Sequence, residues 1–398
     1  MDIRRIIFFA LVACFTIWLP LAFFGLCGQR SALSCSGDLW QSDFWMPRIT
    51  LELGYSALPS AEITKLTEGK KIWPNAKTAV NLYDRCYPPV GMLPLAPFPL
   101  SQQGADFWML FGAAAYLAIV AVAIGFRKAL PLALTAPFVF NFVQSNTIWL
   151  AAATATIFLV WHDSSVRSRR LAAAIALGLA ASMKFSPALL GAMYLPKIFG
   201  KDASQRRSAL GCAALAATAF LALFIIPFTA MPDGFGGMRA MFANAVENGR
   251  HYGAISAFGL GALYRSFLIV VKGSWSAADP VLRSLQGVGQ LLGLAAIACG
   301  AWRKDRTLAA AGMILTFPNM MFYSLLYLLP AIAAEKRPLT WFEGVLLFMM
   351  TCPLQLTVTK ATGQVLSANP TLANAALIAL MAVRLSGHAT TSGDASLN

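Results

Sequence analysis

The side chains best suited to acid–base chemistry in this chain are the carboxylates of one long polar stretch, residues 26–105. None of the 17 acidic residues falls in the middle of an apolar segment. Asp43 stands out because it opens a run, ending at Gly54, that mixes aromatic and apolar positions with polar ones. Such a run is typical of a short helix at a membrane surface. Its expected anchoring residues are Trp40, Phe44, Trp45, Ile49, Leu51 and Leu53. Asp43 is therefore the candidate catalytic acid, although an acid at a helix start is also a common capping or first-turn residue.

Basic residues at two places in the sequence could bind an anion. Lys184 stands between two short apolar segments, where an ammonium group is costly unless it meets an anion or water. The alternative is that its long side chain reaches the outer lipid headgroups. His251, next to Arg250, lies in a polar segment at residues 231–252. A histidine in such a segment is more often a surface residue without a catalytic role.

A third polar feature is the break that holds Asn141, Gln144 and Asn146. These side chains could line a binding pocket, or they could only satisfy backbone groups at a helix end. The chain has no glycine-rich phosphate loop, no H-E-x-x-H and no D-x-D pair, so no nucleotide and no metal is expected as a cofactor. The seven cysteines show no C-x-x-C spacing, which also argues against a metal site.

The elements that must position these residues are membrane helices. Hydrophobic residues make up 58% of the chain and charged residues only 12%, whereas a soluble domain carries about 25% charged residues. The net charge of +14 does not indicate a nucleic-acid partner, because the basic residues form short clusters between apolar segments, as in cytoplasmic loops. We expect an all-α, polytopic integral membrane protein.

Apolar segments and basic clusters predict twelve transmembrane helices with both termini in the cytoplasm. The predicted spans are residues 6–25, 106–126, 129–142, 146–161, 171–183, 185–199, 208–226, 285–301, 307–318, 320–334, 341–356 and 372–383. The first is read as an uncleaved anchor. The chain is thus one membrane domain, residues 1–386, with a long periplasmic loop at 26–105 and a polar cytoplasmic tail at 387–398.

Residues 255–271 are hydrophobic but contain Arg265 and several glycines. We interpret them as an interfacial helix that does not cross the membrane, because this keeps the basic cluster at residues 303–306 inside. A crossing helix is the alternative.

Two pairs of predicted segments, 129–142 with 146–161 and 171–183 with 185–199, are short for a membrane. A helix of about 13–15 residues reaches only about 20 Å, less than the hydrocarbon core of about 30 Å. Such pairs would meet in a dip below the outer surface, where a water-filled cavity would satisfy the polar groups at each break.

Cys35 and Cys86 flank the long polar loop. In an oxidising periplasm they could close it with a disulfide bond. The alternative is two free thiols, and the spacing does not decide between them.

Several short motifs follow one another in a fixed order. They are an acid, an amphipathic run and a glycine at 43–54; an aromatic-Pro-Pro turn at 87–89; an Asn/Gln break at 144–146; and a Gly-rich segment that runs into Lys-x-x-Pro at 178–187. Residues 248–265 and 318–330 follow with an Asn…Arg and a Pro…Tyr segment. This series resembles the GT-C glycosyltransferases that use polyprenyl-phosphate sugars, and most of all glycosyltransferase family 87, the alpha-mannosyltransferase-like membrane proteins. The family's histidine in the last segment is missing here, where Phe322 and Tyr323 stand.

The resemblance implies a GT-C-like fold and transfer of a sugar such as mannose from a polyprenyl-phosphate donor to a lipid or glycan acceptor. The reaction would proceed with inversion, without a metal, on the periplasmic side of a bacterial inner membrane. It implies that Asp43 is the general base that accepts the proton of the acceptor hydroxyl. The candidate phosphate-binding residues are Lys184, Arg250, His251 and Arg265. The candidate pocket-lining residues are Tyr87, Asn141, Gln144, Asn146 and Tyr323.

Two other classes of protein share the apolar segments. A transporter or flippase of lipid-linked sugars would need no carboxylate beside an acceptor and would show inverted repeats, which we do not find in the sequence. A non-catalytic assembly factor would tolerate the loss of both Asp43 and Lys184. The expectation that separates an enzyme from both is that Asp43 and Lys184 face a common cavity.

Overall fold

The computed structural model describes residues 2–13, 42–56, 85–252, 258–276, 278–317, 320–351, 357–359 and 365–386. Within these ranges, only the backbone is described at residues 42–43, 143–144, 250–252, 357–359 and 365–370. Cys35 and Trp40 lie outside the described residues, so the proposed Cys35–Cys86 disulfide stays a prediction.

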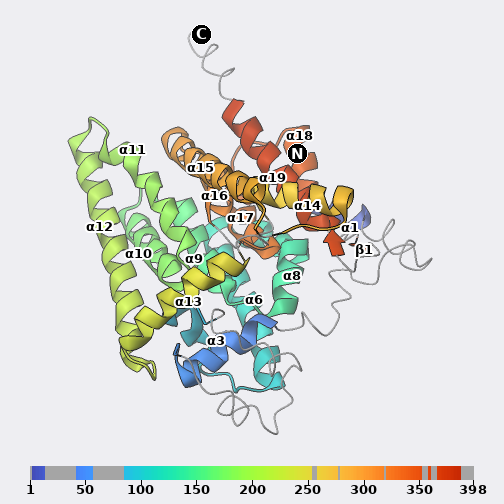
Figure 1. Ribbon diagram of the computed structural model, residues 1–398. Coiled ribbons are helices and arrows are strands. Elements are labelled where there is room, and N and C mark those ends of the chain that lie inside the picture. Colours follow the sequence, from blue (N-terminus) through green and yellow to red (C-terminus); the bar gives the residue numbers. More distant parts are fainter. Residues whose placement is uncertain are drawn as a thin grey trace.

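The described chain is almost entirely helical, which agrees with the expected all-α class (Figure 1). The first half contains α1 (Ile3–Ala13), α3 (Ser42–Leu53), α5 (Pro89–Met92), η4 (Leu93–Leu95), α6 (Gln102–Ile124), α7 (Phe126–Ala129), η5 (Leu130–Leu134), α8 (Ala136–Gln144), α9 (Ile148–Trp161), α10 (Arg167–Met183), η6 (Ser186–Tyr194) and α11 (Leu195–Ile198). The second half contains α12 (Ala203–Ile225), η7 (Ile226–Ala230), α13 (Gly236–Tyr252), α14 (Leu260–Lys272), α15 (Pro280–Arg303), α16 (Arg306–Thr316), η9 (Phe322–Tyr327), α17 (Leu329–Ala333), α18 (Trp341–Thr351) and α19 (Ala368–Ser386).

One short β ladder departs from the helical pattern. Strands β1 (Thr357–Thr359) and β2 (Val365–Ser367) pair in antiparallel register, with Val358 opposite Leu366. Both strands lie in the connection between α18 and α19, so they do not interrupt any helix of the bundle.

Among the described residues, three helices are long and apolar enough to cross a membrane by length and composition, namely Gln102–Ile124, Ala203–Ala230 and Pro280–Arg303. Four shorter apolar helices cover Ile148–Trp161, Phe322–Ala333, Trp341–Thr351 and Thr371–Ser386. These helices agree with the prediction that the chain is a membrane protein. The full count of twelve spans and the non-crossing placement of residues 255–271 stay predictions, and the first predicted span is described only as far as Ala13.

The long helices begin at side chains that satisfy their first backbone N–H groups. Ser101 accepts from the Gly104 amide at 3.2 Å in front of α6, Asp202 from the Ser204 amide at 2.8 Å in front of α12, and Asp279 from the Val281 amide at 2.9 Å in front of α15. Such caps fix where each helix starts. The predicted spans therefore lie within helices whose beginnings are set locally.

Small residues let neighbouring helices approach closely. A Cβ atom on Gly178 of α10 would lie 2.6 Å from the Ala216 carbonyl oxygen of α12, and one on Gly293 of α15 would lie 2.7 Å from the Gly312 carbonyl oxygen of α16. Glycine at these places is typical of helix packing in membranes, where close van der Waals contact replaces the hydrophobic effect between helices.

Both predicted short pairs break where expected, but one segment of each pair is not a single α-helix. α8 ends at Gln144, with Ser145 in the left-handed region, and α9 begins at Ile148. Residues 129–142 contain the end of α7, the 3-10 helix η5 and most of α8. After α10 ends at Met183, residues 185–199 form the 3-10 helix η6 and the short α11. These irregular stretches contain prolines, which lack a backbone donor, namely Pro131 in η5, Pro187 in η6 and Pro196 in α11.

Some of the segments predicted on opposite sides of the membrane lie at opposite ends of the molecule, but α14, predicted on the outer side, lies beside α15 and α19. α11 and the ends of α15 and α18 lie at the top of Figure 1, whereas α3 lies at the bottom. At the upper end Lys197 of α11 forms an ion pair with Asp163 from the turn after α9. Which end faces the cytoplasm stays a prediction from the basic clusters.

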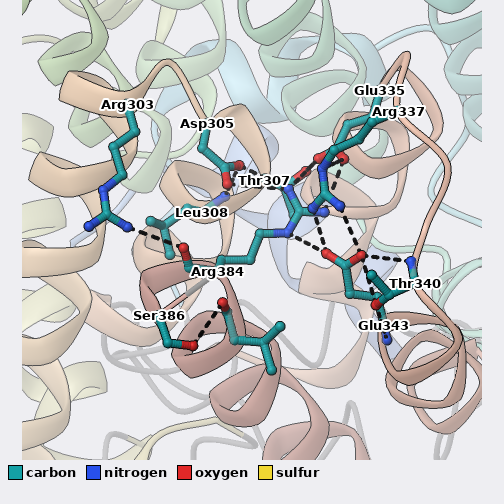
Figure 2. A network of polar contacts seen from close by, with 11 residues as sticks. Arg303, Asp305, Thr307, Leu308, Glu335, Arg337, Thr340, Glu343, Arg384 and Ser386 are labelled. Atoms are coloured by element: carbon teal, nitrogen blue, oxygen red, sulfur yellow. Dashed lines mark hydrogen bonds and ion pairs between the residues drawn. The ribbon is translucent and has the colours of Figure 1, made fainter. Parts of the chain in front are cut away.

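An ion-pair network joins four segments at the upper end (Figure 2). Arg384 of α19 lies 2.6 Å from Glu335, 2.9 Å from Glu343 and 3.1 Å from Asp305. Arg337 adds a 2.6 Å ion pair to Glu343. The Arg384 side chain is only 4% exposed and that of Glu343 only 2%. A guanidinium buried among three carboxylates therefore fixes the turns at the upper end of Figure 1 to the last helix.

Replacing Arg384 with Met is expected to lower the free energy of unfolding by about 3–5 kcal/mol, because it leaves buried carboxylates without their cation. The measurement is a denaturant titration of the purified protein in detergent. Arg303→Met is the control: Arg303 is exposed at the same end and donates to the Arg384 and Leu385 carbonyls, so its loss should cost at most about 1 kcal/mol. Equal losses in both variants would contradict the role assigned to Arg384.

Candidate functional site

Lys184 lies at the break between α10 and η6. Its backbone is extended, with φ −152° and ψ 126°, so the residue ends the helix. The half-buried ammonium group lies 5.6 Å from the centroid of the Tyr323 ring, at the start of η9. A cation over a ring face at this distance is stabilised by the ring quadrupole. The structure therefore joins two of the predicted site residues, which are 139 positions apart in the sequence.

The Tyr-Pro-Pro turn at residues 87–89 leads into a segment that lies beside the Lys184 break. Pro89 starts the one-turn helix α5, which packs against the end of α10. A Cβ atom on Gly91 would lie 2.7 Å from the Met183 carbonyl oxygen, so only glycine allows this approach. The turn thus lies directly beside the residue that precedes Lys184.

α8, which ends at the predicted polar break, also contacts Tyr323. Phe140 stacks on the Tyr323 ring with a centroid distance of 6.2 Å and an interplanar angle of 24°. Asn146 accepts a hydrogen bond from the Ile148 amide at 2.8 Å, so it caps α9, as the alternative interpretation of this break proposed. Asn141 is fully buried, and neither side-chain atom has a hydrogen-bond partner within the protein. The two asparagines therefore have different roles.

The helix predicted to begin at Asp43 is present as α3 and ends at Gly54, as expected. The Asp43 side chain lies outside the described residues, so its catalytic role is a proposal.

The interpretation of Phe44, Trp45 and Ile49 as membrane anchors is wrong. Each is at most 1% exposed and belongs to the protein core, because α3 packs against α5, α6 and α8.

Asp233, in the turn between η7 and α13, holds the end of α3 in place. Its carboxylate accepts hydrogen bonds from the Tyr55 amide, from the Ser56 amide at 2.9 Å and from the Ser56 hydroxyl at 3.2 Å. Gly54 has φ +80°, and a Cβ atom there would collide with the same carboxylate. We call this set of contacts the Asp233 clamp.

Arg85 and Asn244 complete the region around the Asp233 clamp. Arg85 is fully buried and donates from Nη1 to the Ser56 carbonyl at 3.1 Å. Burial lowers the pKa of its guanidinium, and the charge of Asp233 opposes this shift. Asn244 of α13 donates to the Tyr55 and Arg85 carbonyls, each at 3.2 Å. Asn244 therefore joins α13 to two separate parts of the polar loop, at Tyr55 and at Arg85.

Tyr55 connects the Asp233 clamp to the Tyr-Pro-Pro turn. Its hydroxyl donates to the Tyr87 carbonyl at 2.7 Å. Burial raises the pKa of this phenol far above its ordinary value, so it stays protonated and remains a donor. A continuous set of contacts thus runs from α3 through Tyr55 and Tyr87 to α5 and the Lys184 break.

The other predicted site residues are placed only in part. Gln144 ends α8, and Arg250 and His251 lie in the last turn of α13, but their side chains are not among those described. The Arg265 guanidinium lies on α14, 5.4 Å from the centroid of the Trp275 ring. The roles of these residues stay predictions.

The sequence reading missed Asp233, Arg85 and Asn244. The only local signal was a polar segment rich in glycine and asparagine around two of them. Within the described ranges, no group of three or more His, Cys, Asp or Glu side chains is arranged to hold a metal ion.

The model of glycosyltransferase family 87 matches residues 86–326, which is more than half of the chain. The chain belongs to glycosyltransferase family 87. This glycosyltransferase is a membrane enzyme, and nothing in the family match supports the transporter alternative. The matched region contains both Lys184 and Tyr323 and begins after Asp43. No curated protein and no solved structure matched the chain.

Replacing Gly54 with Ala should reduce glycosyltransferase activity by about tenfold or more, because the new Cβ displaces Asp233 and shifts the end of α3. Initial rates of sugar transfer measure this. Gly234→Ala is the matched control, since Gly234 also has a positive φ, +55°, but no atom lies within 4 Å of a Cβ there. Similar rates for the two variants would show that the Asp233 clamp does not position the site.

Proposed function

We propose that this glycosyltransferase moves a sugar from a polyprenyl-phosphate donor to a lipid or glycan acceptor on the periplasmic side of a bacterial inner membrane. The observation that carries the proposal is the half-buried Lys184 ammonium at the break between two short apolar helices, over the Tyr323 ring. An ammonium group in apolar surroundings is stabilised by an anion that reaches it. A phosphate attached to a lipid meets this requirement.

A lipid-linked monophosphate fits this position better than a nucleotide. One lysine supplies one positive charge, which suits a single phosphate, and the chain has no glycine-rich loop to hold a diphosphate. The helices around Lys184 are apolar. Most residues of α9 are buried, whereas α12 is a membrane-span candidate with much of its apolar surface exposed. A polyprenyl chain would lie against the exposed face of α12 at little cost.

The reaction is a single displacement. The acceptor hydroxyl gives its proton to the Asp43 carboxylate, and its oxygen forms a new bond to the anomeric carbon of the sugar. The bond from that carbon to the phosphate oxygen breaks, and polyprenyl phosphate leaves with the electron pair. Attack opposite the leaving group inverts the anomeric configuration, and no metal takes part.

Lys184 would stabilise the negative charge that grows on the leaving phosphate in the transition state. Arg250, His251 and Arg265 are further candidates for this role. Tyr87, Asn141, Gln144, Asn146 and Tyr323 are proposed to line the pocket, although Asn146 already serves as a helix cap. The sugar proposed is mannose, on the family resemblance alone.

The contacts around α3 support a role for Asp43 in the same site. α3 packs on α5 and α8, the two elements that lie beside Lys184 and Tyr323. The Asp233 clamp fixes the far end of α3. A carboxylate at the start of this helix would therefore be held at a constant distance from the Lys184 break.

The direct test is to incubate the purified enzyme with a panel of radiolabelled polyprenyl-phosphate sugars and a lipid acceptor extract. The proposal expects transfer from at least one of them in the presence of a chelator. Transfer only from nucleotide sugars would refute it.

Lys184→Met should lower kcat by about a hundredfold or more, because the leaving phosphate loses its cation. Lys184→Arg keeps the charge and should retain part of the activity. Lys201→Met, an exposed lysine outside the site, is the control and should behave as the wild type. Steady-state kinetics with the accepted donor measure these changes. If kcat of Lys184→Met lies within twofold of the wild-type value, Lys184 has no role in the mechanism.

Asp43→Asn should abolish transfer, with a loss of about a hundredfold to ten-thousandfold as expected for a missing general base, while donor binding persists. Glu52→Gln is the matched control on the same helix, since Glu52 is partly exposed and pairs with Arg48 at 2.6 Å. Its rate should change little. Turnover near the wild-type rate in Asp43→Asn would rule out the assignment.

A further inference from the structure

Four fully buried polar side chains close to Lys184 have no hydrogen-bond partner within the protein. They are Asn141, with both amide atoms, and the hydroxyl groups of Ser186, Ser324 and Tyr327. Leaving such groups unpaired in a protein interior destabilises the fold. A site that keeps four of them together is therefore expected to have a use for them.

Each of the four is tied to the Lys184 break by a contact of its own or of the residue next to it. Ser186 follows Lys184 by two residues and opens η6, and its hydroxyl faces that of Tyr327 in η9, although their geometry is not that of a hydrogen bond. Ser324 follows Tyr323, the residue whose ring lies below the ammonium group. Asn141 follows Phe140, which stacks on that same ring. α8, η6 and η9 thus each bring polar groups towards one place.

Local backbone structure does not account for these side chains. The buried hydroxyls of Thr156 and Thr351 donate to carbonyls of their own helices, at 2.9 and 2.8 Å. The fully buried Asn374 amide donates to the Gly259 carbonyl and accepts from the Gly259 amide, each at 2.9 Å. Asn141, equally buried, makes neither kind of bond. These buried groups are satisfied within the protein, whereas the four around Lys184 are not. The buried hydroxyls of Ser145 and Tyr194 also lack a partner, so what sets the four apart is that they gather around the Lys184 break.

We propose that Asn141, Ser186, Ser324 and Tyr327 bind the ring hydroxyls of the donor's hexose, beside the phosphate held by Lys184. This inference rests on the proposed function. A hexose carries adjacent hydroxyl groups that both donate and accept hydrogen bonds. The amide of Asn141 offers one donor and one acceptor to such a pair, and each of the three hydroxyls can serve in either sense. The Tyr323 and Phe140 rings provide the apolar wall that a sugar ring also needs.

The four residues would then determine which sugar is accepted. A buried polar group that is paired by the correct hydroxyl is left unpaired when that hydroxyl is absent or points the other way. Sites of this kind discriminate strongly between close analogues. The subsite therefore sets the choice between epimers, whereas Lys184 binds the phosphate that all donors share.

The competing explanation is that internal water satisfies the four groups and that they serve the fold alone. The two explanations predict different melting temperatures for variants that lack one of these groups. If water is bound there as part of the fold, removing a polar group lowers the melting temperature and leaves sugar choice unchanged. If the groups exist for the sugar, removing one keeps or raises the melting temperature and reduces turnover.

The experiment uses Asn141→Leu and Ser324→Ala, with Thr156→Val as the control for loss of a buried hydroxyl that is already paired. Each purified variant is given polyprenyl-phosphate glucose, mannose and galactose. We expect a loss of about tenfold or more in kcat/KM for the preferred donor, a weaker preference among the three, and no fall in melting temperature. Thr156→Val should match the wild type, and Lys184→Met should lower the rates with all three donors by the same factor.

Unchanged kcat/KM and donor preference in both variants would overturn the proposal, whatever happens to stability. If the wild type turns over none of the three donors, the proposed function fails, and binding decides the subsite separately. Glucose 1-phosphate and mannose 1-phosphate should then raise the melting temperature of the wild type more than inorganic phosphate does, and this difference should vanish in Asn141→Leu. Equal shifts with sugar phosphate and inorganic phosphate would refute the sugar subsite.

Discussion

The candidate site of this enzyme depends on one ammonium group at a break between helices. A lysine inside an apolar bundle is tolerated only where its charge meets an aromatic face, water or an anion. Lys184 meets the first of these in Tyr323. To make room for it, α10 stops, the chain changes to a 3-10 helix, and a second 3-10 helix carries the ring from far along the sequence. Glycine at position 91 then allows α5 to close over the break.

The sequence predicts the local features of this arrangement well. The helix from Asp43 to Gly54 and the interruption at Lys184 follow from spacing, charge and residue type. These are short-range properties, so a single sequence contains them. The order of the motifs led to the family resemblance, and the match over residues 86–326 confirmed the family.

Contacts between distant segments could not be predicted in the same way. Asp233 bonds to Tyr55 across 178 positions, and nothing near either residue indicates the other. Asn141 and Asn146 look alike in the sequence, yet one remains unpaired and the other caps a helix. Aromatic residues on a short amphipathic run look the same whether they face lipid or protein, which is why Phe44 and Trp45 were assigned to the wrong environment.

The Arg384 network has a consequence for biogenesis. Asp305, Glu335 and Glu343 precede Arg384 in the chain (Figure 2), so the ribosome delivers the three acids before the cation that joins them. Until α19 reaches the bundle, the three carboxylates lack the guanidinium that joins them, and among the described residues the Glu343 carboxylate is paired only with Arg337. A partial intermediate of this kind is where a membrane chaperone or quality-control protease would distinguish unfinished from finished enzyme.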